Sequence, residues 1–306
     1  MTRRVVFAMC LMLLLSAVCG ARQLPIGGAG SVQHQPGIPL IDHTPTPMPS
    51  FEGLAAFIAQ QIEKKHLKDV IVIGVAGPKP DEPTQFGSEL GDKFSVALAG
   101  QSKAFQVGER GQLRDFVKKN RVSDAMVVSD ALANWIAAKV GAEGYVLLKF
   151  LNVSPFRADV EAILCETAKD DGNFLEASNT AIDLTDNQYL NGFRAIDSDW
   201  NKETYTKDEY RQLPPSHLPV CSSCPQPEYT DAGRKERVTN EKVNLEITVF
   251  PDGKAGNIVV LKSARYGLTA SFVETILQRW KFKSALDADG KAIAVRLPVE
   301  AFFQLY

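Results

Sequence analysis

The chain has 306 residues, of which 45% are hydrophobic, and its 34 basic and 36 acidic side chains give a formal charge of −2. Basic residues form no stripe or tail, so this balance argues against a nucleic-acid partner. At this length two domains are expected.

The N-terminus has the parts of a secretory signal peptide. Arg3-Arg4 precedes an apolar run from Val5 to Val18, and Cys19-Gly20-Ala21 offers the small residues needed for cleavage after Ala21. We therefore predict a signal peptide, 1–21, and an exported, periplasmic protein. The alternative is a retained membrane anchor, for which the run is short, because a spanning helix needs about 20 apolar residues. Membrane contact is expected only in that case.

Residues 22–50 are predicted to form a flexible linker. Prolines and glycines are scattered through them with almost no periodic apolar pattern, a composition typical of a partly extended tether. The prolines are Pro25, Pro36, Pro39, Pro45, Pro47 and Pro49.

Between residues 51 and 200 the pattern predicts a mixed α/β domain. Apolar residues at helical spacing from Leu54 to Leu67 are followed by a buried strand, Asp69–Val75. Further helices are expected around Leu90 to Leu98 and at 112–120 and 130–140. Further strands are expected at 104–107, 143–152, 156–167 and 174–184.

This region resembles the periplasmic N-terminal domains of the TolB and CsgG type. The matching features are the strand Lys68–Val72, the helix Leu90–Leu98, the segment Gly108–Arg110 and the segment Val140–Tyr145. The resemblance implies a binding or assembly module whose sheet is completed by paired strands, and it carries over no catalytic residue.

Three cysteines would remain after removal of the signal peptide. Cys165 lies on a predicted strand, where we expect it to be reduced and buried as a small apolar side chain. Export favours a disulfide between Cys221 and Cys224, after a second linker at 201–220. Two alternatives stay open: a redox-active pair, and a zinc site that includes His217 but lacks an obvious fourth ligand.

The pattern of residues 243–306 predicts two strands, a helix and a final strand, in that order. Val243–Phe250 alternates apolar and polar residues, Pro251-Asp252-Gly253 supplies a turn, and Asn257–Ala264 returns as the second strand. An amphipathic helix follows and ends near Trp280. A long alternating strand then runs to Tyr306.

Residues 221–306 resemble the TonB C-terminal domain. The pattern is carried by Pro227, Tyr229, Pro251-Asp252-Gly253, Trp280, Phe282, Ala285, Gly290 and the strand from Val299 to Leu305. The resemblance implies an α+β module that takes part in transmembrane transport by adding a strand from an envelope or outer-membrane protein to its sheet.

The partner-binding strand is predicted to be Ala292–Leu305, the last and longest of this module. Pro298 fits an edge strand, since proline cannot donate to a ladder on the side that its nitrogen faces. Val295, Leu297, Val299 and Ala301 fall on one face, and Arg296, Glu300 and Phe302 on the other.

The sequence contains no recognisable catalytic, cofactor or metal motif. We therefore predict a non-enzymatic periplasmic interaction protein that binds by strand addition. One alternative is an anchored energy transducer of the TonB type. The other is a thiol-disulfide or hydrolytic enzyme whose site is formed by residues far apart in sequence.

Overall fold

The computed structural model describes residues 45–75, 84–122, 129–154, 156–184, 204–205, 212 and 214–304. All of these belong to one compact unit, Pro36–Leu305. They form a six-stranded sheet and a five-stranded sheet, each with helices of its own, together with a small two-stranded sheet. This arrangement confirms the two-domain α+β fold class.

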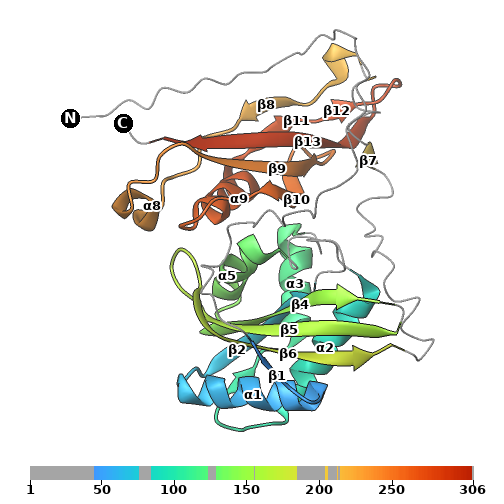
Figure 1. Ribbon diagram of the computed structural model, residues 1–306. Helices are drawn as coiled ribbons and strands as arrows, with labels where there is room; N and C mark the ends of the chain where they lie inside the picture. Colours follow the sequence, from blue (N-terminus) through green and yellow to red (C-terminus); the bar gives the residue numbers. More distant parts are fainter. Residues whose placement is uncertain are drawn as a thin grey trace, which may run out of the picture. The chain divides into compact units, whose positions relative to one another are not determined.

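The N-terminal sheet has the strand order β1-β6-β5-β4-β2-β3 (Figure 1). β2 is parallel to β3 and β4, whereas β4, β5 and β6 pair antiparallel. The strands are β1 (Thr46–Pro47), β2 (Asp69–Val75), β3 (Gln106–Val107), β4 (Gly144–Val153), β5 (Arg157–Glu166) and β6 (Asn173–Asp183). The predicted bounds of β2, β4, β5 and β6 are confirmed to within one residue.

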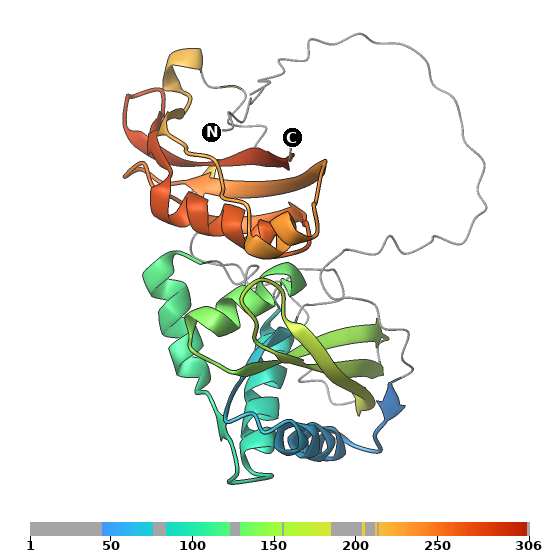
Figure 2. The ribbon, with the colours of Figure 1, turned by 90° about the vertical axis from the view of Figure 1, so that its left-hand side faces the viewer.

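Helices cover both faces of this sheet (Figures 1 and 2). On one face, α1 (Phe51–Lys64) and α2 (Gln85–Ala99) share a core with Val70 and Val72 of β2. On the other face, α3 (Arg110–Asn120) and α5 (Asp130–Lys139) pack against Ile71 and Ile73. Successive side chains of a strand point to opposite faces, so β2 is buried on both sides, as its continuous apolar run predicts.

The start of the described chain adds a short strand to this sheet. β1 pairs parallel with Ser178 and Asn179 of β6, and the Met48 N–H donates to the Asn179 carbonyl at 2.7 Å. Residues 46–47 were expected to belong to the flexible linker, because a two-residue strand leaves no periodic pattern in sequence.

The C-terminal module, by which we mean residues 220–304, contains the second sheet, in the order β10-β9-β13-β12. Its strands are β9 (Glu241–Val249), β10 (Ala255–Lys262), β12 (Ala285–Leu286) and β13 (Ala292–Phe303), and β7 (Thr204–Tyr205) joins it from outside the module. The helix α9 (Leu268–Arg279) lies against one face of this sheet (Figure 2). The predicted order of strand, strand, helix and strand is confirmed.

The hairpin and α9 share the core of this module. Every second residue of β9 from Val243 to Val249 is buried, as the alternation predicts, and these side chains meet Phe272 and Ile276 of α9. The helix therefore forms where its apolar stripe has a sheet to cover.

Several short strands, β7 and β12 among them, had no counterpart among the predicted elements. β8 (Val220–Ser223) pairs antiparallel with β11 (Lys281–Lys283), directly after α9, and α8 (Asp231–Lys235) precedes β9. Such short elements depend on contacts with distant parts of the chain, which local patterns do not record.

Candidate functional site

The predicted partner-binding strand forms β13 and has the expected two faces. The buried or half-buried face carries Val295, Leu297, Val299 and Ala301, and the opposite face carries Arg296, Glu300 and Phe302. The alternation holds because β13 pairs with β9 in unbroken register from Val295 to Phe303.

The solvent face of β13 combines charge with an exposed aromatic ring. Phe302 is 47% exposed, and the Lys242 Nζ lies 4.8 Å from its ring centroid. The same ammonium group is 2.6 Å from Glu300 Oε2. Arg296 pairs with Glu246 at 3.8 Å. The Lys242–Glu300 pair is partly exposed, and pairs of this kind contribute little to stability.

The outer side of β13 is covered only at the beginning of the strand. Ala292 and Ile293 pair with β12, and Ala294 and Val295 pair with β7. From Leu297 to Phe303 no strand of the described chain pairs with that side. The edge predicted over Ala292–Leu305 is therefore shorter, because β7 and β12 are too short to be predicted from sequence.

Pro298 indicates which residues point their backbone groups outward. In an antiparallel ladder both polar groups of a residue face the same side, and the side alternates along the strand. Proline within a sheet places its nitrogen toward the open side. Pro298 lies opposite Glu246 of β9, so by this alternation the N–H and C=O groups of Glu300 and Phe302 face away from β9.

The other edge of the sheet, β10, is irregular. Its pairing with β9 shifts register twice, between Gly256 and Val259 and again between Val260 and Lys262. Within the first irregular stretch, the Asn257 N–H donates to the Arg121 carbonyl, at the end of α3, at 2.9 Å. Irregular, covered edges pair poorly with other chains.

The Pro251-Asp252-Gly253 turn has a defined partner in the module. Gly253 has φ +77°, and a Cβ there would lie 2.1 Å from the Phe282 carbonyl. The Gly253 carbonyl accepts the Phe282 N–H at 2.8 Å. Only glycine meets both requirements, because it alone adopts positive φ readily and lacks a Cβ. The turn thus packs against β11.

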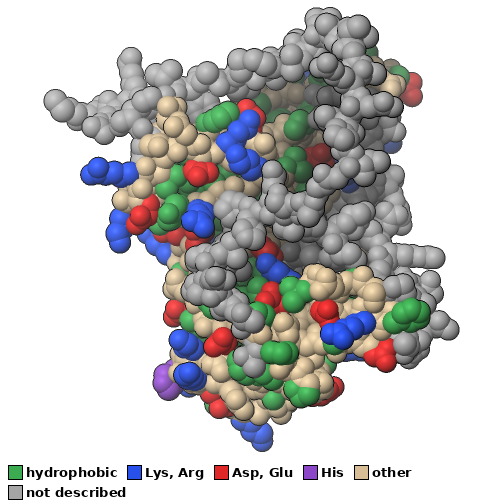
Figure 3. Space-filling model, viewed as in Figure 1, with side chains coloured by type: hydrophobic (Ala, Val, Ile, Leu, Met, Phe, Trp, Pro, Cys, Tyr) green, Lys and Arg blue, Asp and Glu red, His purple; other side chains and the backbone are tan. Residues whose placement is uncertain are grey.

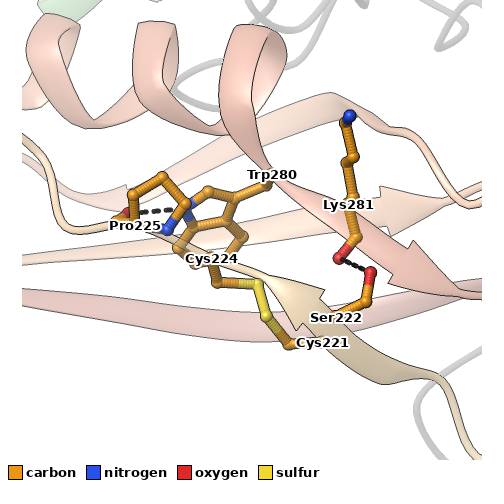
Figure 4. Close-up of a disulfide and its surroundings, with 6 residues drawn as sticks. All are labelled: Cys221, Ser222, Cys224, Pro225, Trp280 and Lys281. Carbon is orange, nitrogen blue, oxygen red and sulfur yellow. Dashed lines mark hydrogen bonds between the residues drawn. A yellow bond between two sulfur atoms is a disulfide. The ribbon is translucent and has the colours of Figure 1, made fainter.

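Cys221 and Cys224 form the predicted disulfide (Figure 4). Ser222, between them, donates its hydroxyl to the Lys281 carbonyl at 2.9 Å, and the Trp280 indole N–H donates to the Pro225 carbonyl at 2.9 Å. These hydrogen bonds and the strand pairing hold β8 beside β11, and the disulfide closes the short segment from Cys221 to Cys224. Cysteines joined in this way are not thiolate ligands for zinc.

Metal-ligating side chains do not gather in the described part of the chain: it holds no group of three His, Cys, Asp or Glu residues placed to bind an ion. His217 lies in a short 3₁₀ turn, Pro215–His217, and its Nδ1 is buried without a hydrogen-bond partner.

Cys165 is the free cysteine of the described residues and is buried on β5. Burial raises the pKa of its thiol to about 11, against a smaller opposite effect of the hydrogen bond with Tyr145. A thiol of this kind is unreactive near neutral pH, because the thiolate is the nucleophile.

Alkylation tests both assignments. In the native, unreduced processed chain we expect an iodoacetamide probe to label no cysteine, and after unfolding without reductant to label Cys165 alone. Mass spectrometry of tryptic peptides measures this. Rapid labelling of two thiols in the native protein would contradict the disulfide.

A cavity of about 490 Å³ lies beside the β5–β6 turn, lined by residues that include Lys169, Asp171, Arg265 and Tyr266. Burial raises the pKa of the Asp171 carboxyl. Both of its oxygens are engaged: one accepts the Gly267 N–H at 2.9 Å and the other the Tyr266 N–H. This carboxylate therefore has a structural role at the start of α9.

Charged side chains of both signs are mixed over the described surface in Figure 3, without a large patch of one sign on that face. None of the helices in the ranges that the structure describes combines the length and the apolar character that crossing a membrane requires.

No family model matches the sequence, and no curated protein matches it. Among solved structures, the chain is similar to the C-terminal domain of LpoB from Salmonella enterica, with 16% identity over 44% of this chain and 98% of that chain and a TM-score of 0.33. It is similar to the lipoprotein GNA1162 from Neisseria meningitidis, with 11% identity over 38% of this chain and 79% of that one and a TM-score of 0.31.

The TonB C-terminal domain from Pseudomonas aeruginosa is also similar, with 22% identity over 28% of this chain and 86% of that chain and a TM-score of 0.24. Membership of the TonB family stays a prediction.

Proposed function

We propose that this chain is a non-enzymatic periplasmic interaction protein, which binds an extended segment of an envelope or outer-membrane protein as an added strand alongside β13. The observation that carries the proposal is the outer side of β13 from Leu297 to Phe303, which has no strand partner in the described chain. A row of unpaired N–H and C=O groups is a template for a further strand.

The two edges of the sheet differ in a way that supports β13 as the binding edge. β10 is broken by register shifts and contacts Arg121, whereas β13 is regular over nine paired residues. Backbone pairing would give affinity, and the outward side chains Glu300 and Phe302 would contact alternate side chains of the partner.

The site of action we propose, the periplasm, rests on the signal peptide predicted at 1–21, which lies outside the described residues. Mass determination of the mature N-terminus tests this part. Intact Met1 in membrane fractions would favour the anchored transducer instead.

A proline substitution tests the β13 edge. Glu300→Pro removes an outward N–H without adding bulk to the β9 side, so we expect at least about a tenfold loss of partner binding, the equivalent of one or two backbone hydrogen bonds. The readout is photocrosslinking from a benzoyl-phenylalanine placed at Phe302, in cells, followed by mass spectrometry of the adducts.

The matched control is Glu300→Ala, which also loses the pair with Lys242 but keeps the N–H. Adduct yield should persist in Glu300→Ala and fall in Glu300→Pro, with both variants folded by circular dichroism. Equal yields in two folded variants would rule out this edge.

A further inference from the structure

The edge of β10 is in close contact with the end of α3. Arg121, the residue that ends α3, has φ +54°, and its carbonyl accepts the Asn257 N–H at 2.9 Å. A Cβ built on Gly256 would lie 2.9 Å from both the Cβ and the carbonyl oxygen of Arg121. The backbone of β10 therefore lies so close to Arg121 that position 256 has no room for a side chain.

The side chain of Arg121 holds the hairpin turn of the same strand. Its guanidinium donates to both carboxylate oxygens of Asp252, at 3.0 and 2.6 Å, and lies 5.0 Å from the centroid of the Phe250 ring. The hydrogen bond from Arg121 is the largest of the effects that lower the pKa of Asp252. Two-point pairing fixes the orientation of an arginine as well as its position.

A second contact between the N-terminal domain and the module forms at the start of α9. The Asp171 carboxylate accepts the N–H groups of Tyr266 and Gly267, just before α9. Asn134 of α5 holds the loop that carries Asp171, since its side-chain amide donates to the carbonyls of Ala168 and Asp170 and accepts the Ala168 N–H, all within 3.0 Å.

Apolar side chains fill the space between these polar contacts. Leu113 of α3 and Ile136 of α5 belong to the same buried cluster as Val260 of β10 and Val273 of α9. The contact is therefore continuous, with a buried apolar centre and charged or polar groups at both ends, as in stable interfaces.

We propose that the N-terminal domain covers the β10 edge of the C-terminal module through Arg121, and so directs a partner strand to the β13 edge. The second half of this statement rests on the proposed function. The first half, the covered edge, is a property of the chain alone. Natural sheets commonly cover an edge with a helix or loop to prevent unwanted pairing.

Hydrogen exchange of the Asn257 amide in the mature chain tests the cover. Gly256→Ala adds the Cβ that collides with Arg121, so we expect the Asn257 amide to exchange about tenfold faster, as for the loss of one hydrogen bond. Gly111→Ala is the matched control, because a Cβ there meets nothing within 4 Å. It should leave the Asn257 rate unchanged.

Arg121→Ala provides a second variant that adds no atom. Loss of the contacts with Asp252 and Phe250 should also speed exchange at Asn257, whereas Arg157→Ala, which removes an exposed pair with Asp159, should not. Unchanged exchange at Asn257 in both Gly256→Ala and Arg121→Ala would overturn the covered edge. No partner enters this measurement, so its failure is distinct from a negative crosslinking result at Phe302.

Discussion

Replacing Phe272 by alanine is expected to lower the free energy of unfolding by about 3–5 kcal/mol, the usual cost of emptying a buried phenylalanine site. Phe272 is 1% exposed on α9, and its ring meets Trp280 edge to face with centroids 5.6 Å apart. It belongs to the buried cluster that joins α9 to β9 and β10. A loss of this size is a large part of the total stability of a typical domain, about 5–15 kcal/mol.

Urea denaturation followed by far-ultraviolet circular dichroism measures this loss. The matched control is Phe156→Ala, the same substitution at a side chain that is 69% exposed, for which we expect a change within about 0.5 kcal/mol. If Phe272→Ala costs no more than Phe156→Ala, the apolar face of α9 does not hold the module together.

The elements that could be predicted from sequence are those whose cause is local. The hairpin of β9 and β10 follows from strict alternation and from the Pro251-Asp252-Gly253 turn, and β13 follows from its long alternation around Pro298. The disulfide between Cys221 and Cys224 follows from the short spacing together with the export signal predicted at 1–21. Each of these patterns is a short continuous stretch of the chain, the hairpin from Glu241 to Lys262 being the longest.

The contacts that could not be predicted join residues far apart in sequence. Asp252 was assigned to a turn, yet its carboxylate binds Arg121, 131 positions away. Asp171 lies between β5 and β6, and the two N–H groups that donate hydrogen bonds to it lie 95 and 96 positions away. A single sequence carries no record of such pairs, because the side chains suit an exposed turn equally well.

Replacing Asp171 by alanine is expected to lower the free energy of unfolding by about 1–3 kcal/mol, since it leaves two N–H groups before α9 without their acceptor. Both groups lie at the positive end of the helix dipole, where a carboxylate is favourable. Gly267 has φ +68°, and a Cβ there would lie 3.1 Å from Asp170, so this close approach of the two loops requires glycine.

The raised pKa of Asp171 also predicts how stability depends on pH. Burial, its largest influence, raises its pKa above the ordinary value of 3.8, against smaller lowering effects of the two N–H groups and of Arg265; Asp170 adds to the rise. The folded protein therefore binds this proton more tightly than the unfolded chain. The stability that this proton adds to the folded state is fully present below the ordinary pKa and is lost as the pH rises through the raised pKa.

The effect of Asp252 on stability has the opposite dependence on pH. Because Arg121 lowers the pKa of Asp252, the stability contributed by this carboxylate is lost as the pH falls through the lowered pKa.

Comparing the chain with Asp171→Asn isolates the effect of Asp171, since asparagine keeps one acceptor oxygen but does not titrate. We expect the stability of the unmodified chain, relative to Asp171→Asn, to decrease as the pH rises from 3.8, the ordinary pKa, through the raised pKa of Asp171. A relative stability that increases over this range would show that the hydrogen bonds from Tyr266 and Gly267 outweigh burial at this carboxylate.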